Sequence, residues 1–241
     1  MLHLSDQQRS WLRWIFTGST GIRAGWSILI FAAVIAAATG ALQLVLYLIH
    51  FKKPQGALSA GFLILAELIS IATVLGANAV MARIESRSIW SYGLTGANRL
   101  ANFLLGCAGG FMSLCLVICL LWAGGYIVFD GVALRGVPAL SYGVVSLFGF
   151  FLVGVAEETI FRGFIYGWLH RWGPAVLAVP LSAVIFSALH QQLVLFLPLF
   201  FVGLVLSLLY QGSRSVIPGV LTHALFNLPN IILILSTTST C

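Results

Sequence analysis

The sequence predicts an all-α membrane protein, a polytopic bundle of seven or eight transmembrane helices around an intramembrane polar cavity. Hydrophobic residues make up 60% of the 241 residues and charged residues only 7%, and the mean hydropathy is +1.06. The few charges stand between apolar runs long enough to cross a bilayer, which takes about 20 residues of helix. A chain of this composition has too little polar surface to fold in water.

The charges and cysteines exclude several classes of function. A formal net charge of +6 would suggest nucleic-acid binding in a soluble domain, but here the basic residues are scattered between apolar runs. They are expected to set the topology and to contact lipid headgroups, so no nucleic-acid partner is predicted. The four cysteines give no disulfide framework, because Cys107, Cys115 and Cys119 share one apolar segment and Cys241 lies at the end.

The first half of the chain contains three predicted spans. Residues 1–25 place arginines among tryptophan and aliphatic residues, which suits a short amphipathic helix in the headgroup region. The apolar run 26–49 is long enough to span, so we expect a retained helix rather than a cleaved signal peptide. The second span is predicted over residues 57–82, with Glu67 inside it, and the third over residues 100–128.

The second half of the chain contains four more predicted spans. The span over residues 139–169 is too long for a helix perpendicular to the membrane, so we expect it to be tilted, broken or extended past the lipid. Pro174 opens a fifth span that reaches residue 190, since proline commonly occupies the first helical position. A sixth covers residues 193–210 and a seventh residues 216–235. Pro180 and Pro198 could break these segments and leave the count at seven or eight.

The distribution of basic residues predicts the orientation. With the N-terminus inside, eight basic residues fall in inside segments and three (Lys52, Lys53 and Arg135) in outside segments. This excess predicts a cytoplasmic N-terminus. The short loops favour a small protein of a prokaryotic plasma membrane. The inside residues are Arg9, Arg13, Arg23, Arg83, Arg87, Arg99, Arg171 and Arg214.

The strongest functional signal is the stretch VAEETIFRGFI at residues 155–165, which holds two of the six acidic residues. A charge at the centre of a bilayer costs about 3 kcal/mol on insertion scales, so a carboxylate pair there indicates a functional site. On a helix, Glu158 and Arg162 are four residues apart and can pair on one face. Glu157 points about 100° away from Glu158 around the helix axis and has no basic partner on its own face. A structural salt bridge with a spare acid remains the alternative for this stretch alone.

Two later stretches also place polar residues in apolar segments. FSALH ends at His190, and HALFN places His223 and Asn227 four residues apart on one helix face. These residues cannot all face lipid together with Glu157, Glu158 and Arg162. We therefore expect the whole set to share one internal polar cavity. Such a cavity has the groups that hydrolysis needs: a carboxylate base, imidazoles and an amide donor for an oxyanion. Glu157, His190 and His223 are also zinc-ligand types, although no HExxH motif is present.

These stretches match the EExxxR, FxxxH and HxxxN motifs, in order and separation, of the CPBP family, and residues 139–235 resemble these intramembrane proteases. The family includes type II CAAX prenyl endopeptidases and bacterial (Abi) proteins linked to bacteriocin processing and self-immunity. The resemblance implies that Glu157 activates water with help from His190, and that His223 and Asn227 stabilise the oxyanion. Glu158 and Arg162 would orient the site.

The resemblance also implies the partners and cofactors. The substrate would be a membrane-associated protein or peptide, which could carry a CAAX prenyl group. Family members have been described both as metalloproteases and as metal-free glutamate-dependent proteases. Asn227 suits an oxyanion donor better than a metal ligand, so we expect no required cofactor. Zinc held by Glu157, His190 and His223 is the alternative.

Two rival functions from other classes fit the same residues. One is a non-catalytic membrane scaffold or immunity protein, and the other is a proton-coupled transporter, which would more commonly show inverted repeats. On the favoured interpretation the chain divides into an amphipathic segment (1–25), N-terminal transmembrane helices (26–138), a catalytic core (139–235) and a tail (236–241).

One geometric expectation conflicts with a shared site. Counted from the predicted inside ends at about 1.5 Å per residue, Glu157 would lie about 18 Å deep, His190 about 24 Å and His223 about 10 Å. Straight helices with these boundaries would hold the three side chains apart.

Overall fold

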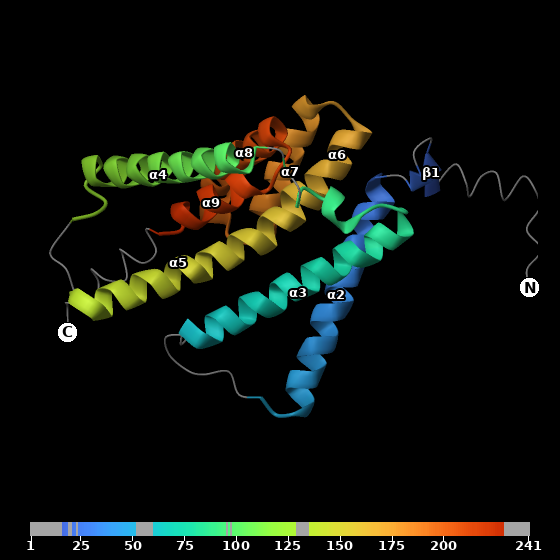
Figure 1. Ribbon diagram of the computed structural model, residues 1–241, viewed down its shortest axis with the longest axis horizontal. Coiled ribbons are helices and arrows are strands. Elements are labelled where there is room, and N and C mark those ends of the chain that lie inside the picture. The colour runs from blue at the N-terminus through green and yellow to red at the C-terminus, as the bar shows by residue number, and fades with distance from the viewer. Residues whose placement is uncertain are drawn as a thin grey trace, which may run out of the picture.

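The computed structural model describes residues 16–18, 21–22, 24–51, 60–94, 96, 98–128 and 135–228. These residues are almost entirely helical, which confirms the predicted helical membrane bundle (Figure 1). Five described helical stretches are long and apolar enough to cross a membrane, and two shorter apolar helices, α7 and α9, correspond to the predicted fifth and seventh spans. The protein is therefore an integral membrane protein.

The helices follow the predicted runs with small shifts of their ends. Over the described residues the order is α2 (Ala24–Leu48), α3 (Ala60–Ile84), η1 (Ile89–Ser91), α4 (Arg99–Ala123), α5 (Gly136–Glu158), η2 (Thr159–Tyr166), α6 (Gly167–Trp172), α7 (Ala175–Leu189), η3 (Leu193–Leu195), α8 (Phe196–Ser213) and α9 (Ile217–Phe226). The predicted seventh span is described only as far as residue 228, and the proposed tail lies outside the described residues.

The short amphipathic helix predicted within residues 1–25 stays a prediction, because residues 1–15 lie outside the described part. Where the chain is described, Thr17–Gly18 (β1) and Gly21–Ile22 (β2) pair as two short antiparallel strands, and α2 starts at Ala24. Two glycines in this stretch disfavour helix, which explains why the pattern of arginine and apolar residues is not continued as one.

The long fourth span is one continuous helical rod. α5, η2 and α6 run from Gly136 to Trp172 over 37 residues, about 55 Å at helical rise. Its middle portion, η2, is π-helical over eight residues. A π-helical stretch widens the helix and re-aims the side chains around it, and such stretches are frequent at functional sites. The wider turns begin directly after Glu157 and Glu158.

The short helix α9 is held between α4 and α5 (Figure 1). Glycines allow this close approach: a Cβ atom on Gly106 of α4 would lie 2.8 Å from the carbonyl oxygen of Pro218, and one on Gly154 of α5 would lie 2.9 Å from that of Val220. Thr222 of α9 donates a hydrogen bond to the Gly106 carbonyl at 3.1 Å. Small residues at helix crossings are the usual means of close packing in membranes.

The hydrophobic core surrounds the π-helical segment. Phe164 is fully buried and stacks on Phe31 of α2 with ring centroids 3.8 Å apart. Tyr92, just after η1, packs against the same ring at 5.4 Å. This packing fixes η2 from the side of the N-terminal helices, while α7, α8 and α9 pack on the rest of the rod.

Candidate active site

The charged centre of the site is the ion pair between Glu158 and Arg162. Arg162 Nη1 lies 2.7 Å from Glu158 Oε1, and neither side chain has exposed surface. The guanidinium also donates from Nη2 to the Gly203 carbonyl of α8 at 3.1 Å and lies 4.6 Å from the centroid of the Phe186 ring. A buried charge needs such complete compensation. The predicted i,i+4 pairing is present, and it joins the rod to α7 and α8.

His223 enters the site from α9 and lies against both carboxylates. Its Nδ1 is 3.1 Å from Glu158 Oε1, so the ring N–H donates to that carboxylate. Its Nε2 is 3.8 Å from Glu157 Oε2. The imidazole is buried, with 5% of the residue exposed, and the Phe186 ring meets it edge-on at 6.1 Å. Glu158 therefore fixes the ring and leaves Nε2 directed toward Glu157.

His190 reaches the same carboxylate from the end of α7. Its Nδ1 lies 2.8 Å from the Phe186 carbonyl, and because a carbonyl can only accept, the ring donates there. Its Nε2 lies 3.8 Å from Glu157 Oε2. Both imidazoles thus turn Nε2 toward one oxygen atom, while another hydrogen bond orients each ring through Nδ1.

The conflict in depth disappears because α7 and α9 pack so that both imidazoles meet Glu157. α7 has only 15 residues with Pro180 inside it, and His190 caps its end. α9 has 10 residues and carries His223 in its last turn. The estimate that separated His190 from His223 by about 14 Å assumed straight spans perpendicular to the membrane. The structure brings Glu157, Glu158, Arg162, His190 and His223 together.

Asn227 stands apart from this group. It is the C-cap of α9, and its backbone N–H donates to the His223 carbonyl at 3.1 Å. Among the described residues, no hydrogen bond holds its side-chain amide. The helix places it one turn beyond His223 on the same side, as the spacing predicts, but the structure does not attach it to the carboxylates.

Glu67 belongs to the surroundings of the site. It lies on α3, which packs against α5, the helix that carries Glu157. The sequence left open whether this acid lines a path for substrate or pairs with a basic group. Within the described part of the chain, Glu67 has no basic partner in an ion pair.

The same donors are the candidate ligands of a metal ion. Two imidazoles and one carboxylate are zinc-ligand types, and each Nε2 lies 3.8 Å from Glu157 Oε2. Nevertheless, the described residues contain no group of three or more His, Cys, Asp or Glu side chains placed to hold a metal ion. In this conformation the described donors do not fit a zinc site.

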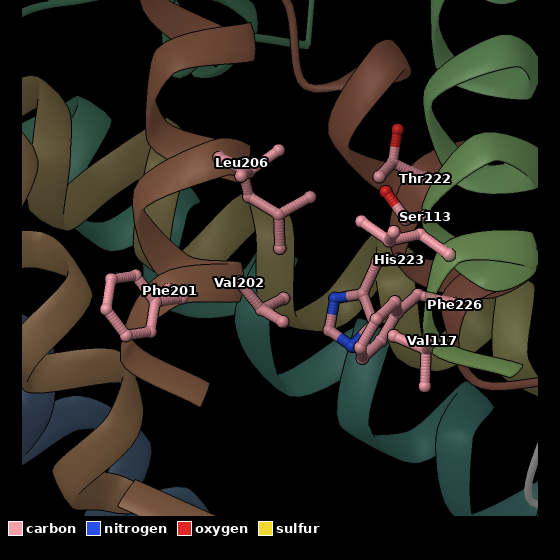
Figure 2. A pocket seen from close by; sticks show the side chains of 10 residues that line it. Ser113, Val117, Phe201, Val202, Leu206, Thr222, His223 and Phe226 are labelled. Carbon is pink, nitrogen blue, oxygen red and sulfur yellow. The ribbon is translucent and has the colours of Figure 1, made fainter. Parts of the chain in front are cut away.

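A cavity of about 170 Å³ opens beside His223 (Figure 2). Figure 2 shows Phe201, Val202 and Leu206 of α8 on one side, and Ser113 and Val117 of α4 on the other, with the His223 ring between them. The lining is almost wholly apolar. The arrangement can receive an apolar group next to a polar reacting centre.

Two contributors to the site have no motif that marks them. Gly219 of α9 lies so close to the ion pair that a Cβ there would be 2.7 Å from Glu158 Oε2. Gly203 of α8 supplies the carbonyl that accepts from Arg162. A glycine in an apolar helix is unremarkable in sequence, although Gly219 lies four residues before His223 and so on the same helix face.

Comparison with known proteins identifies the domain that contains this site. Residues 139–229 match the family model described as "Type II CAAX prenyl endopeptidase Rce1-like". No curated protein matches the chain. No solved structure matches it either. The matched segment begins in α5 and contains all three polar motifs. Residues 139–229 thus form a domain of the Rce1-like type II CAAX prenyl endopeptidase family, as the motifs predicted.

Proposed function

We propose that this protein is an intramembrane endopeptidase that hydrolyses a peptide bond with a water molecule activated by Glu157. The observation that carries the proposal is the convergence of His190 Nε2 and His223 Nε2 on Glu157 Oε2, each at 3.8 Å. Two atoms 3.8 Å apart are too far for a direct hydrogen bond. They are close enough for one water molecule to lie within about 2.8 Å of both.

The environment supports Glu157 rather than Glu158 as the base. Glu158 is paired with Arg162 and accepts from His223, so its charge is compensated. Glu157 Oε2 is buried and has no hydrogen-bond partner among the described residues. A carboxylate without a fixed partner can accept a proton from water, whereas a compensated one loses two strong interactions when it is protonated.

The reaction follows from these positions. Glu157 takes a proton from water as the water oxygen attacks the carbonyl carbon, which gives a tetrahedral oxyanion and a neutral carboxylic acid on Glu157. Protonated His223 can donate from Nε2 to the oxyanion, and the free amide of Asn227 can supply a second donor. Transfer of the proton from Glu157 to the amine nitrogen breaks the C–N bond and restores the carboxylate. His190 helps to hold the water through Nε2.

The apolar cavity suggests how a substrate is held. An apolar side chain or a prenyl group in the space beside His223 would place an adjacent peptide bond near Glu157. The family model that residues 139–229 match is described as a type II CAAX prenyl endopeptidase. We therefore expect a membrane-associated protein or peptide as substrate, and a prenylated C-terminal motif is the first to test.

The test combines purified protein in liposomes with intact membranes. Matched peptides that differ only in a farnesyl group on cysteine are incubated with wild type and with Glu157→Gln, and the products are identified by mass spectrometry. Protein termini in membranes of expressing cells are compared for the same pair at equal abundance. New termini specific to wild type support the proposal. Equal cleavage by Glu157→Gln would overturn the role of Glu157, and no cleavage by wild type in either assay would favour a scaffold.

Metal dependence is tested separately. The metal-free mechanism predicts that wild type purified with a chelator keeps its activity and that added zinc does not raise it. If chelation abolishes activity and zinc restores it, Glu157, His190 and His223 act as ligands in a conformation different from this one.

A further inference from the structure

A second cavity, which is polar, lies at the end of the bundle where several spans begin or end. It measures about 200 Å³ and is lined by three arginines from three separate segments. Arg87 follows α3, Arg171 is in the last turn of α6, and Arg214 follows α8. All three belong to the segments predicted to be cytoplasmic. The structure brings these distant segments to one cavity, as expected of loops on the same side.

The positive charge of this cavity is only partly compensated. Glu85 is the nearby acid: its Oε2 accepts from the Tyr92 hydroxyl at 2.9 Å and lies 3.6 Å from Arg87 Nη1. Neither Arg171 nor Arg214 has a described carboxylate oxygen within the 4.0 Å of a salt bridge. Three arginines therefore face one glutamate, whose hydrogen-bonded oxygen is already used.

Buried donors without partners line the same cavity. Tyr166 and Trp168 are 0% and 3% exposed, and neither Tyr166 Oη nor Trp168 Nε1 has a hydrogen-bond partner in the described part of the protein. A buried donor left unsatisfied costs about 1–3 kcal/mol. Native proteins rarely leave such groups unpaired unless a ligand, ion or water satisfies them.

The backbone at Arg214 adds to this pattern. It ends α8 with φ of 54°, in the left-handed region, where glycine is the usual residue. A side chain in that conformation costs roughly 1–2 kcal/mol. Arginine at this position therefore places a cation at the cavity, although glycine would adopt this backbone conformation with less strain.

From these observations we propose that the cavity binds a phosphate group. Phosphate oxygens are mainly hydrogen-bond acceptors, and they carry a charge that arginines satisfy well. Tyr166 and Trp168 offer donors that need acceptors, and Trp168 can act only as a donor. The arginines stand at the ends of spans, at the level of lipid headgroups, so the phosphate belongs either to a phospholipid or to a free phosphate ion.

This site is separate from the proposed peptidase centre. Arg171 lies 14 residues beyond Glu157 on the same rod, about 20 Å at helical rise. The π-helical segment connects the two, because Arg162 belongs to the peptidase centre and Tyr166 to the phosphate cavity. The phosphate-binding proposal and the peptidase proposal can therefore fail independently of each other.

The experiment measures binding to delipidated full-length protein in a neutral detergent by native mass spectrometry. Dioleoyl phosphatidic acid is titrated against dioleoylglycerol, which lacks the phosphate, and inorganic phosphate is added up to millimolar concentration. The test variants are Arg171→Gln/Arg214→Gln, which removes two exposed charges, and Tyr166→Phe, which removes one hydroxyl. The matched control is Arg83→Gln/Arg99→Gln, which removes the same charge from residues that do not line the cavity.

We expect the double test variant to weaken phosphatidic acid binding by roughly tenfold or more and Tyr166→Phe by about threefold, since charge-assisted hydrogen bonds are the stronger ones. The control should stay within about twofold. If inorganic phosphate competes at equal concentration, the source is free phosphate, and if it does not, the source is a lipid headgroup. Equal losses in test and control variants, or equal binding of dioleoylglycerol, would overturn the proposal.

Discussion

Glu158 and Arg162 form an ion pair of 2.7 Å in which neither side chain has exposed surface. The same Glu158 oxygen accepts from His223 Nδ1 at 3.1 Å. The pair therefore has two roles: it joins the rod to α8 through the Gly203 carbonyl, and it orients the imidazole that faces Glu157. These two roles can be separated by mutation.

Arg162→Met should destabilise the protein strongly, because it leaves Glu158 buried without its cation. Removal of one partner of a buried pair costs about 3–5 kcal/mol. The double variant Glu158→Leu/Arg162→Met replaces the whole pair by apolar groups, so it should recover most of the stability and yet remain inactive, since His223 loses its acceptor. Unfolding in detergent and peptidase assays on the single and double variants measure both effects. An active double variant would show that Glu158 does not orient His223.

His190 should affect catalysis without affecting stability. Its side chain is 27% exposed, and its proposed partner is a water molecule held with Glu157. His190→Gln should therefore lower kcat by about 10²-fold, because a displacement of about 1 Å in the attacking water can cost that much, with little change in KM. Thermal unfolding of the variant should match wild type. His170→Gln serves as the control, because His170 lines the phosphate cavity rather than the peptidase centre. A rise in KM with unchanged kcat would instead place His190 in substrate binding.

The sequence was sufficient to predict the polar motifs and most spans, because both depend on local patterns. The pairing of Glu158 with Arg162 follows from i,i+4 spacing alone. Prediction from the sequence fails where contacts between distant segments determine the position of a residue or helix. The position of His190 beside Glu157 depends on how α7 packs against the rod, and no local pattern predicts that α9 packs between α4 and α5.

The π-helical segment shows a second limit. Residues 159–166 contain neither proline nor any other local signal that would distinguish a π-helix from an α-helix. Their geometry is set by the packing of Phe164 against Phe31 and by the close approach of Gly163 to the Tyr92 carbonyl, which leaves no room for a Cβ atom on Gly163. These contacts join residues more than 70 positions apart and are visible only in the structure.

The unusual environment of Glu85 predicts a dependence of stability on pH. Burial raises the pKa of this carboxyl above its usual value, although the Tyr92 hydroxyl and the arginines oppose the rise. A group whose pKa is raised on folding contributes stability that is present below the unfolded pKa and is lost as pH rises through the folded pKa. Wild type should thus gain stability as pH falls from 7 toward 4.5, and Glu85→Gln should show a smaller gain. Thermal unfolding of both proteins over this range gives the comparison; identical pH profiles would show that Glu85 titrates alike in both states.

Gly219 gives the most specific test of the site, because it touches the ion pair and has no chemical role. A Cβ at this position would lie 2.7 Å from Glu158 Oε2, closer than such contacts occur, so Gly219→Ala must displace either the carboxylate or α9. Either shift moves His223 relative to Glu157, and a displacement of about 1 Å can cost roughly 10²-fold in rate. We expect Gly219→Ala to lower kcat by about that factor while the protein still inserts and folds. Gly143→Ala on α5 is the matched control, since nothing lies within 4 Å of a Cβ there. Peptidase rates and circular dichroism of the two variants decide the question, and equal activity in both would mean that the packing of α9 against Glu158 does not position the reacting groups.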